Sequence, residues 1–309
     1  MAYITRRTLL GAATAAAIAS PAGAAAPVKV GSKLDTEAAL LGTVVLLLLE
    51  AGGIPTESRL RLGPTKILRA AILSGDVDLY PEYTGNGAFF FNQESNPAWK
   101  DPRQGYDLVR KLDADANRLA WLPPAPANNT WGLVVNGAVA AKEKLATMED
   151  FARWASAGGP KSDVKLAASA EFVESPAALP AFQAAYGFKL AANQLVVLAG
   201  GDTAATERAA AEGISGVNAA MAYGTDGAIA ALDLRLMDDT RHAQMVYEPS
   251  PVIRQAALDA NPAIPGLLAP AFAALDGGTL RTLNGKIAVD GQDVGAVATA
   301  WLKEKGLLK

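Results

Sequence analysis

The strongest constraint on the fold is a regular alternation of strand-like and helix-like segments that begins near residue 28. The expected elements are, in order, a strand at 28–31, a helix at 36–50, a strand at 57–62, a helix at 65–74 and a strand at 77–80. Asp35 is placed to cap the first helix, and Gly52 and Gly53 end it. Units of this β-α-β-α-β kind form parallel sheets whose strand carboxyl ends meet at a crevice.

A second alternating set predicts a second lobe. A Pro-rich approach at 121–127 leads to a crossing strand at 131–135, and the chain is expected to return between 234 and 247. The final helical segments, ending with 294–305, would then pack on the first lobe. We therefore expect an α/β protein of two lobes, each a mainly parallel sheet flanked by helices, joined by two hinge crossings. The expected bounds are 27–129 plus 240–309 for lobe 1, and 130–239 for lobe 2.

The first residues predict export. Arg6 and Arg7 precede a weakly apolar, Ala-rich run at 9–19, which ends in small residues near Ala24. This arrangement is typical of a twin-arginine signal peptide, which we place at 1–26. The run is too weakly apolar for a membrane span. We expect a soluble protein of the periplasm.

Composition excludes several classes of partner and site. Removing Arg6 and Arg7 takes the basic residues from 28 to 26 against 31 acidic ones, a formal charge of −5 for the mature chain, so nucleic acid is not an expected partner. The chain has no cysteine, and His242 is its only histidine. Disulfides, histidine-ligated metal sites and histidine-based triads are therefore excluded, and no metal or cofactor is expected.

The segment Pro81–Asn86 reads as a binding loop at the end of the third strand. Pro81 restricts the backbone and Gly85 permits conformations that other residues avoid, so Tyr83 and Asn86 can be held toward a ligand. An ordinary strand-end turn is the alternative.

Four sequence blocks carry a resemblance to a known family; they are Val30–Lys33, Tyr80–Gly87, Asn128–Trp131 and Ala222–Gly227. The chain resembles the glycine betaine and choline (osmoprotectant) substrate-binding proteins of ABC importers, in particular the YehZ/OsmF type. The resemblance covers essentially the whole mature chain. It implies a type II-like periplasmic binding protein fold and no enzymatic activity.

In that family, aromatic rings from both lobes enclose a quaternary ammonium group. Carried over by position, the resemblance implies four rings: Tyr83, Trp131, Tyr223 and Tyr247. The physical reason is that a trimethylammonium group has no hydrogen-bond donor, so the negative faces of aromatic rings are the groups that can replace its water. Plain core packing is the alternative for each ring taken singly.

Lys33 and Asn86 are the candidates for the ligand carboxylate. Lys33 would offer a positive charge to the ligand carboxylate, at a family position that often carries a neutral donor. The Asn86 amide can donate a hydrogen bond to the same carboxylate, whereas an acidic side chain at this position would repel it. Both residues favour glycine betaine over choline. A solvated lysine, or one paired to Asp35, Glu37 or Asp226, is the alternative reading.

Further residues are possible secondary contacts. They come from the same blocks, from the start of the first helix and from one strand-to-helix turn: Thr36, Asn129, Thr130, Glu171, Phe172 and Asp226. For Glu171 and Phe172 a capped helix start is the alternative, and for Asp226 a turn that braces Tyr223.

The sequence thus predicts a monomeric solute receptor that delivers its ligand to the transmembrane subunits of an ABC permease. A separate ATPase subunit would use the ATP, because this chain has no Gly-rich phosphate loop of the GxxxxGK[ST] type. Paired acids such as Asp76 and Asp78 are the sole hint of catalysis and are usually solvated. An exported α/β interaction protein, or a receptor for another solute without a working cage, is the alternative function.

Overall fold

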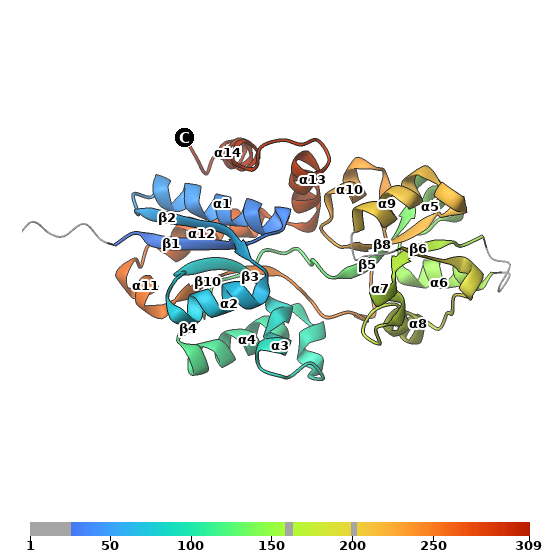
Figure 1. The fold of residues 1–309 in the computed structure, drawn as a ribbon, viewed down its shortest axis with the longest axis horizontal. Helices are drawn as coiled ribbons and strands as arrows, with labels where there is room; N and C mark the ends of the chain where they lie inside the picture. Colours follow the sequence, from blue (N-terminus) through green and yellow to red (C-terminus); the bar gives the residue numbers. More distant parts are fainter. Residues whose placement is uncertain (1–25, 158–162, 199–202) are drawn as a thin grey trace, which may run out of the picture.

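The computed structural model of the protein describes residues 26–157, 163–198 and 203–309 (Figure 1). The signal peptide expected at 1–26 lies outside the described residues except for its last position.

The first sheet has five strands in the order β2-β1-β3-β10-β4. Their bounds are β1 (Val28–Lys33), β2 (Thr56–Gly63), β3 (Leu79–Tyr83), β4 (Leu119–Trp121) and β10 (Pro249–Arg254). Four strands come from the first 121 residues and one from the last part of the chain, as a two-lobe fold with a returning chain requires.

The second sheet also has five strands, in the order β7-β6-β8-β5-β9. Their bounds are β5 (Trp131–Asn136), β6 (Leu166–Ser169), β7 (Leu195–Leu198), β8 (Ala219–Tyr223) and β9 (Leu234–Leu236). The expected two-lobe α/β fold is confirmed.

The sheets are mixed, which refines the expectation of mainly parallel ones. Each sheet has two parallel pairings. In the first sheet β1 pairs parallel with β2 and with β3, and in the second sheet β6 pairs parallel with β7 and with β8. The strand that follows each passage between the lobes, β10 or β5, pairs antiparallel on both sides. These two strands enter from the neighbouring lobe instead of from a β-α-β crossover, so nothing constrains them to run parallel.

Among the residues that the structure describes, eight α-helices surround the first sheet: α1 (Thr36–Ala51), α2 (Thr65–Ser74), α3 (Gly87–Phe90), α4 (Pro102–Asn117), α11 (Gln255–Ala260), α12 (Ile264–Ala274), α13 (Gly277–Ala288) and α14 (Val294–Glu304). Asp35 caps α1 as predicted, because its side chain accepts a hydrogen bond from the Ala38 N–H at 2.8 Å. Apolar side chains of α1, α12, α13 and α14 pack on one face of the sheet, and those of α2 and α4 on the other.

In the described part of the second lobe, six α-helices surround the sheet: α5 (Gly137–Glu143), α6 (Met148–Ser156), α7 (Ala170–Glu174), α8 (Leu179–Tyr186), α9 (Thr203–Glu212) and α10 (Gly227–Ala231). Successive residues of β5 point to opposite faces, so Leu133 and Val135 join the core under α6 and α8, whereas Val134 joins the core under α9. Both faces are covered, and for this reason the central strands are apolar throughout.

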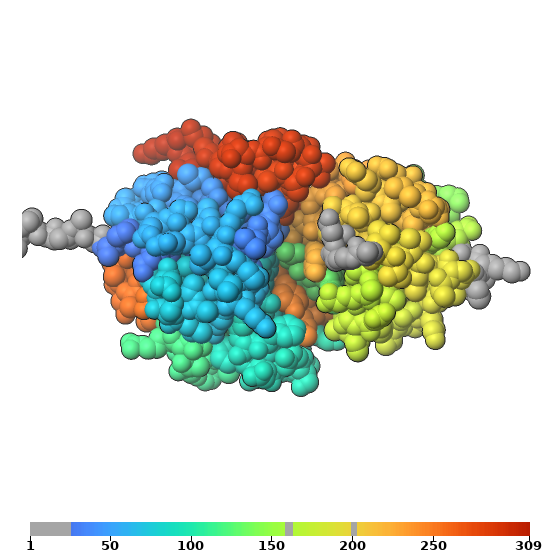
Figure 2. All heavy atoms as spheres, viewed as in Figure 1, coloured from blue at the N-terminus to red at the C-terminus, as the bar shows by residue number. Residues whose placement is uncertain are grey.

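The chain passes between the sheets twice, at 122–130 and 237–248, where no strand of either sheet lies. The lobe bounds predicted from the sequence, 129/130 and 239/240, fall inside these two passages and stay a prediction. Figure 2 shows the surface indented between the lobes, with the passages visible at the base of the indentation.

Helix α13 of the first lobe contacts α10 of the second (Figure 1). A β-carbon on Gly227 would collide with the backbone of Asn284 and Gly285, so two helices meet here backbone to backbone. The Arg281 side chain also donates to the Gly224 carbonyl at 2.8 Å. The lobes therefore touch at a third place besides the two passages.

The third strand is longer than predicted. β3 runs through Tyr83 and a 3₁₀ turn (Thr84–Asn86) follows, so Tyr83 lies at a strand end and not in a free loop. β10 pairs with β3 as far as Pro249 opposite Tyr83, and this pairing extends the strand beyond the residues that the local pattern indicates.

Among the described residues, no helix is long and apolar enough to cross a membrane.

The buried ion pair of Asp113 with Arg69 generates a stability prediction. Asp113 is 0 % exposed, accepts two hydrogen bonds from Arg69 at 2.6 and 2.8 Å, and accepts a third from the Trp121 ring N–H. Asp113→Asn leaves a buried guanidinium without its counterion, so we expect a loss of about 3 kcal/mol in urea unfolding. The control is Asp115→Asn on the same helix, whose partner Lys111 is exposed; we expect about 0.5 kcal/mol or less.

Candidate functional site

A cavity of about 1060 Å³ lies between the two lobes. Its walls include the start of α1, the end of β3 and both passages. In the second lobe they include the amino end of β5, the carboxyl end of β8 and the starts of the helices that follow the other strands. This is the location that strand direction predicts for a ligand in an α/β fold.

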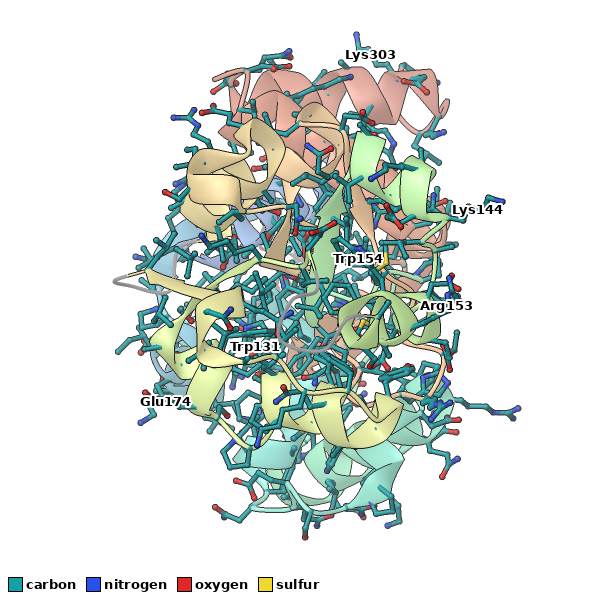
Figure 3. All side chains as sticks on the ribbon, turned by 90° about the vertical axis from the view of Figure 1, so that its right-hand side faces the viewer. Trp131, Lys144, Arg153, Trp154, Glu174 and Lys303 are labelled. Atoms are coloured by element: carbon teal, nitrogen blue, oxygen red, sulfur yellow. The ribbon has the colours of Figure 1, made fainter. Side chains whose placement is uncertain are left out.

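Trp131 and Tyr223 form the aromatic wall of the second lobe. They are directly opposite in the antiparallel pairing of β5 and β8, so both rings lie on the same face. Their ring centroids are 6.3 Å apart with an interplanar angle of 27°, and Phe172 packs edge-on against Trp131 at 5.8 Å. Trp131 lies toward the middle of the molecule in Figure 3, whereas Glu174 lies at its edge.

Tyr83 and Tyr247 contribute rings from the first lobe and the return passage. All four predicted rings, these two with Trp131 and Tyr223, line the cavity. The Tyr247 ring lies over Gly85, where a β-carbon would come within 2.9 Å of it, so the glycine is needed for this close approach. Burial raises the pKa of Tyr247 to about 12, which keeps its hydroxyl protonated at neutral pH.

Lys33 and Asn86, the residues expected to bind the ligand carboxylate, are not among the residues that line the cavity. Both side chains instead donate to one oxygen of Glu82, Lys33 at 2.5 Å and Asn86 at 2.7 Å. The Tyr83 N–H donates to the same oxygen at 2.7 Å, and the Tyr80 hydroxyl donates to the other at 3.0 Å. Glu82 is 0 % exposed, and a fully buried carboxylate requires such partners. None of the three acids considered for Lys33 in the sequence is its partner.

The Lys33 ammonium group also lies 4.7 Å from the centre of the Tyr83 ring. It therefore makes a cation–π contact with the ring that was predicted to receive the ligand ammonium. Since Lys33 is buried and Tyr83 borders the cavity, the lysine supports this ring from the protein side.

Glu37 holds the other end of Tyr83. The Tyr83 hydroxyl donates to the Glu37 carboxylate at 2.7 Å, and the amide groups of Asn129 and Asn284 donate to it at 3.2 and 2.7 Å. Burial raises the pKa of Glu37, and hydrogen bonds from Thr225, Tyr83 and Asn284 oppose that shift.

The residues predicted as secondary contacts include some that line the cavity and one that does not. Five of them line the cavity: Thr36, Asn129, Thr130, Glu171 and Asp226. Phe172 is fully buried behind Trp131 and does not line it. Asp226 accepts a hydrogen bond from the Tyr223 N–H at 2.7 Å, which is the bracing role expected of it.

The charge of the cavity wall is negative. Its acidic residues are Asp35, Glu37, Glu94, Glu171, Glu207 and Asp226, and among the described residues that line it Lys100 alone is basic. Lys100 donates to the Ala243 carbonyl at 3.0 Å. A wall of this sign attracts a cation and repels a free anion. Across the described ranges, no group of three acidic or histidine side chains is arranged to hold a metal ion.

Sequence reasoning missed the roles of Glu82 and Glu37. The signal for both was present: each is an acid within an otherwise buried segment, β3 or the first turn of α1. An acid in such a place needs buried donors, and the nearby lysine, asparagine and tyrosine residues are those donors.

Comparison with known proteins identifies the fold and the family. The family model described as the substrate binding domain of an ABC-type glycine betaine transport system matches residues 26–304. The chain is 54 % identical over 294 residues to the glycine betaine-binding protein YehZ of Escherichia coli (strain K12), and the match covers 95 % of each chain.

A solved structure of apo YehZ from Escherichia coli superposes with a TM-score of 0.86 at 55 % identity, covering 92 % of this chain and all of that one. The chain is also 28 % identical over 285 residues to the glycine-betaine-binding protein of Pseudomonas aeruginosa, covering 91 % of this chain and 88 % of the relative.

The Lys33–Glu82 pair generates a prediction about stability, which tests whether Lys33 stabilises the fold. Lys33→Met leaves the Glu82 carboxylate buried without its counterion, so we expect the free energy of unfolding to fall by about 3 kcal/mol. The double variant Lys33→Met with Glu82→Gln removes both charges and should recover most of that loss in urea unfolding. A Lys33→Met protein of unchanged stability would contradict this assignment.

A second prediction concerns Glu248 in the return passage. Burial raises the pKa of Glu248 from 4.5 to about 7. The folded state thus binds this proton more tightly than the unfolded state, and the stability that results is fully present below pH 4.5 and lost as the pH rises through 7. Glu248→Gln cannot titrate, so its melting temperature relative to the unsubstituted protein should rise between pH 5 and pH 8. A difference independent of pH would refute the shift.

Proposed function

The chain belongs to the family of substrate-binding domains of ABC-type glycine betaine transport systems, and from this premise we propose that it captures glycine betaine or a related quaternary ammonium solute in an aromatic cage between its lobes. Members of this family bind their solutes and catalyse no reaction. The observation that carries the proposal is the convergence of four aromatic rings on one cavity.

The rings match the chemistry of a trimethylammonium group. Such a group carries a positive charge without a polar hydrogen, so stacked ring faces stabilise it by cation–π attraction, at about 2 kcal/mol for a desolvated contact. Trp131 and Tyr223 contribute rings from the second lobe, and Tyr83 and Tyr247 contribute rings from the first lobe and the return passage. A ligand enclosed by both sets would bridge the two lobes.

The acidic wall of the cavity supports binding of the ammonium group of the ligand. It also affects whether glycine betaine or choline binds more tightly. Sequence reasoning favoured glycine betaine over choline because of Lys33 and Asn86, and both of these residues bind Glu82 instead. The names of the two relatives favour glycine betaine. The wall itself favours a net cation, so choline is the appropriate competitor in every binding experiment.

The carboxylate of glycine betaine would bind to hydroxyl groups of the cavity wall, against the repulsion of Asp35 and Glu37 that flank one of them. Thr36 is the first residue of α1 and lines the cavity, as does Thr130 in the first passage. Hydroxyl groups donate to carboxylates, and the amino end of a helix carries a partial positive charge.

The remaining steps follow from the proposed role. The protein would be exported by its twin-arginine leader, work as a monomer in the periplasm, and deliver its ligand to the transmembrane subunits of a permease. A separate ATPase subunit would drive import. An exported interaction protein, or a receptor for a different solute, remains the alternative that the binding experiment addresses.

Removal of single rings tests the cage. Trp131→Ala and Tyr223→Ala should each weaken binding of glycine betaine by about tenfold or more, since each removes one desolvated cation–π contact. Isothermal titration of the mature protein with glycine betaine and with choline measures the change, and circular dichroism checks that each variant folds. The control is Phe91→Ala, which removes a ring outside the cavity and should leave the affinity unchanged.

The outcomes separate the candidates. Saturable binding that both cavity variants lose and the control keeps supports the cage. Binding that no ring variant weakens would refute the cage while leaving a solute receptor. A folded protein that binds neither solute would refute the proposed function in favour of another ligand or an interaction role.

A further inference from the structure

The Glu37 carboxylate connects several segments that form the cavity wall. This carboxylate, on the first turn of α1, accepts hydrogen bonds from Tyr83 at the end of β3, from Asn129 in the first passage and from Asn284 on α13. Those donors belong to three segments far apart in the sequence. Glu37 itself is 5 % exposed, so the carboxylate is committed to these partners.

The same carboxylate is connected to the second lobe. Asn284 shares its amide group between Glu37 and the Thr225 carbonyl, the latter at 2.9 Å. The Thr225 side chain also hydrogen-bonds Glu37. Thr225 lies two residues after Tyr223, in the turn that leads to α10, so this contact reaches the aromatic wall of the second lobe.

We propose that Glu37 is a positioning residue for ligand binding: its carboxylate fixes the Tyr83 ring and, through Asn284 and Thr225, sets that ring in register with the Trp131–Tyr223 wall of the other lobe. The inference rests on the proposed function, because it concerns the affinity of the same cage. It assigns to a residue outside the four rings the role of placing them relative to one another.

The contact between α13 and α10 makes this role effective. At Gly227 and Gly285 the two backbones touch without intervening side chains, so small changes in the position of α13 are passed directly to the turn that follows Tyr223. Asn284 precedes Gly285 in the chain. A side chain that holds Asn284 therefore holds the contact point as well.

Replacement of the carboxylate separates positioning from folding. Glu37→Gln cannot accept from Tyr83 and Asn284 with both of its terminal atoms, because one of them becomes an amide donor. It also relieves the burial of a charge, which opposes ionisation of Glu37 in the folded protein. We expect a melting temperature within about 4 °C of the unsubstituted protein and an affinity for glycine betaine that is lower by about tenfold or more.

Two further variants test the geometry. Glu37→Asp keeps the charge but is shorter by one methylene, so it should lose affinity as Glu37→Gln does; an unchanged affinity would mean that the charge alone matters. Thr225→Val removes the hydroxyl from the second lobe and should weaken binding in the same direction. The control is Glu174→Gln, which removes one negative charge from an exposed site at the edge of the molecule (Figure 3).

A double-mutant cycle with Tyr83→Phe gives the deciding measurement. Tyr83→Phe keeps the ring but removes the hydroxyl that Glu37 holds. If Glu37 acts through this ring, the two substitutions should not add. The affinity of the double variant Glu37→Gln with Tyr83→Phe for glycine betaine should then be no more than about threefold below that of the weaker-binding single variant. If the loss of affinity in the double variant equals the product of the two single losses, the inference is overturned, because Glu37 would then act on the ligand independently of Tyr83.

The failures of the two proposals are distinguishable. If the unsubstituted protein binds glycine betaine or choline and Glu37→Gln binds it equally well, the inference is wrong and the proposed function stands. If the unsubstituted, folded protein binds neither solute, the proposed function is wrong and the inference falls with it.

Discussion

The buried carboxylate of Glu82 is the group on which the site depends. It lies in a strand where every neighbour is buried, and it is compatible with that environment because Lys33, Asn86, Tyr80 and a backbone amide all donate to it. The consequence is a rigid strand end. The Tyr83 ring that borders the cavity is held at its backbone by Glu82 and is contacted on its ring by Lys33, so these protein contacts orient it.

Much of the fold could be predicted from the sequence, because local signals specify it. The cap at Asp35 and the apolar periods of the first unit place α1 and its flanking strands nearly as observed. The mixed direction of the sheets could not be predicted in that way. It depends on where β10 and β5 enter their sheets, which is a long-range property.

The site was predictable in part for the same reason. Three of the four rings, Tyr83, Trp131 and Tyr223, occur in blocks that the resemblance identifies, and all four line the cavity. The partner of Lys33 was not predictable, because a lysine near a strand end faces several acids at similar distances in sequence. Only the packing of β1 beside β3 shows that Glu82, 49 positions away, is the one it meets.

The meeting of α10 and α13 also limits how the lobes can move. Two backbones in direct contact leave no side chain that could yield, so the lobes cannot approach one another more closely at Gly227 and Gly285. A movement that preserves this contact changes the width of the cleft most at the side farthest from α13. Solute would therefore enter and leave at the edge formed by α3 and α8, which lies away from α13 in Figure 1.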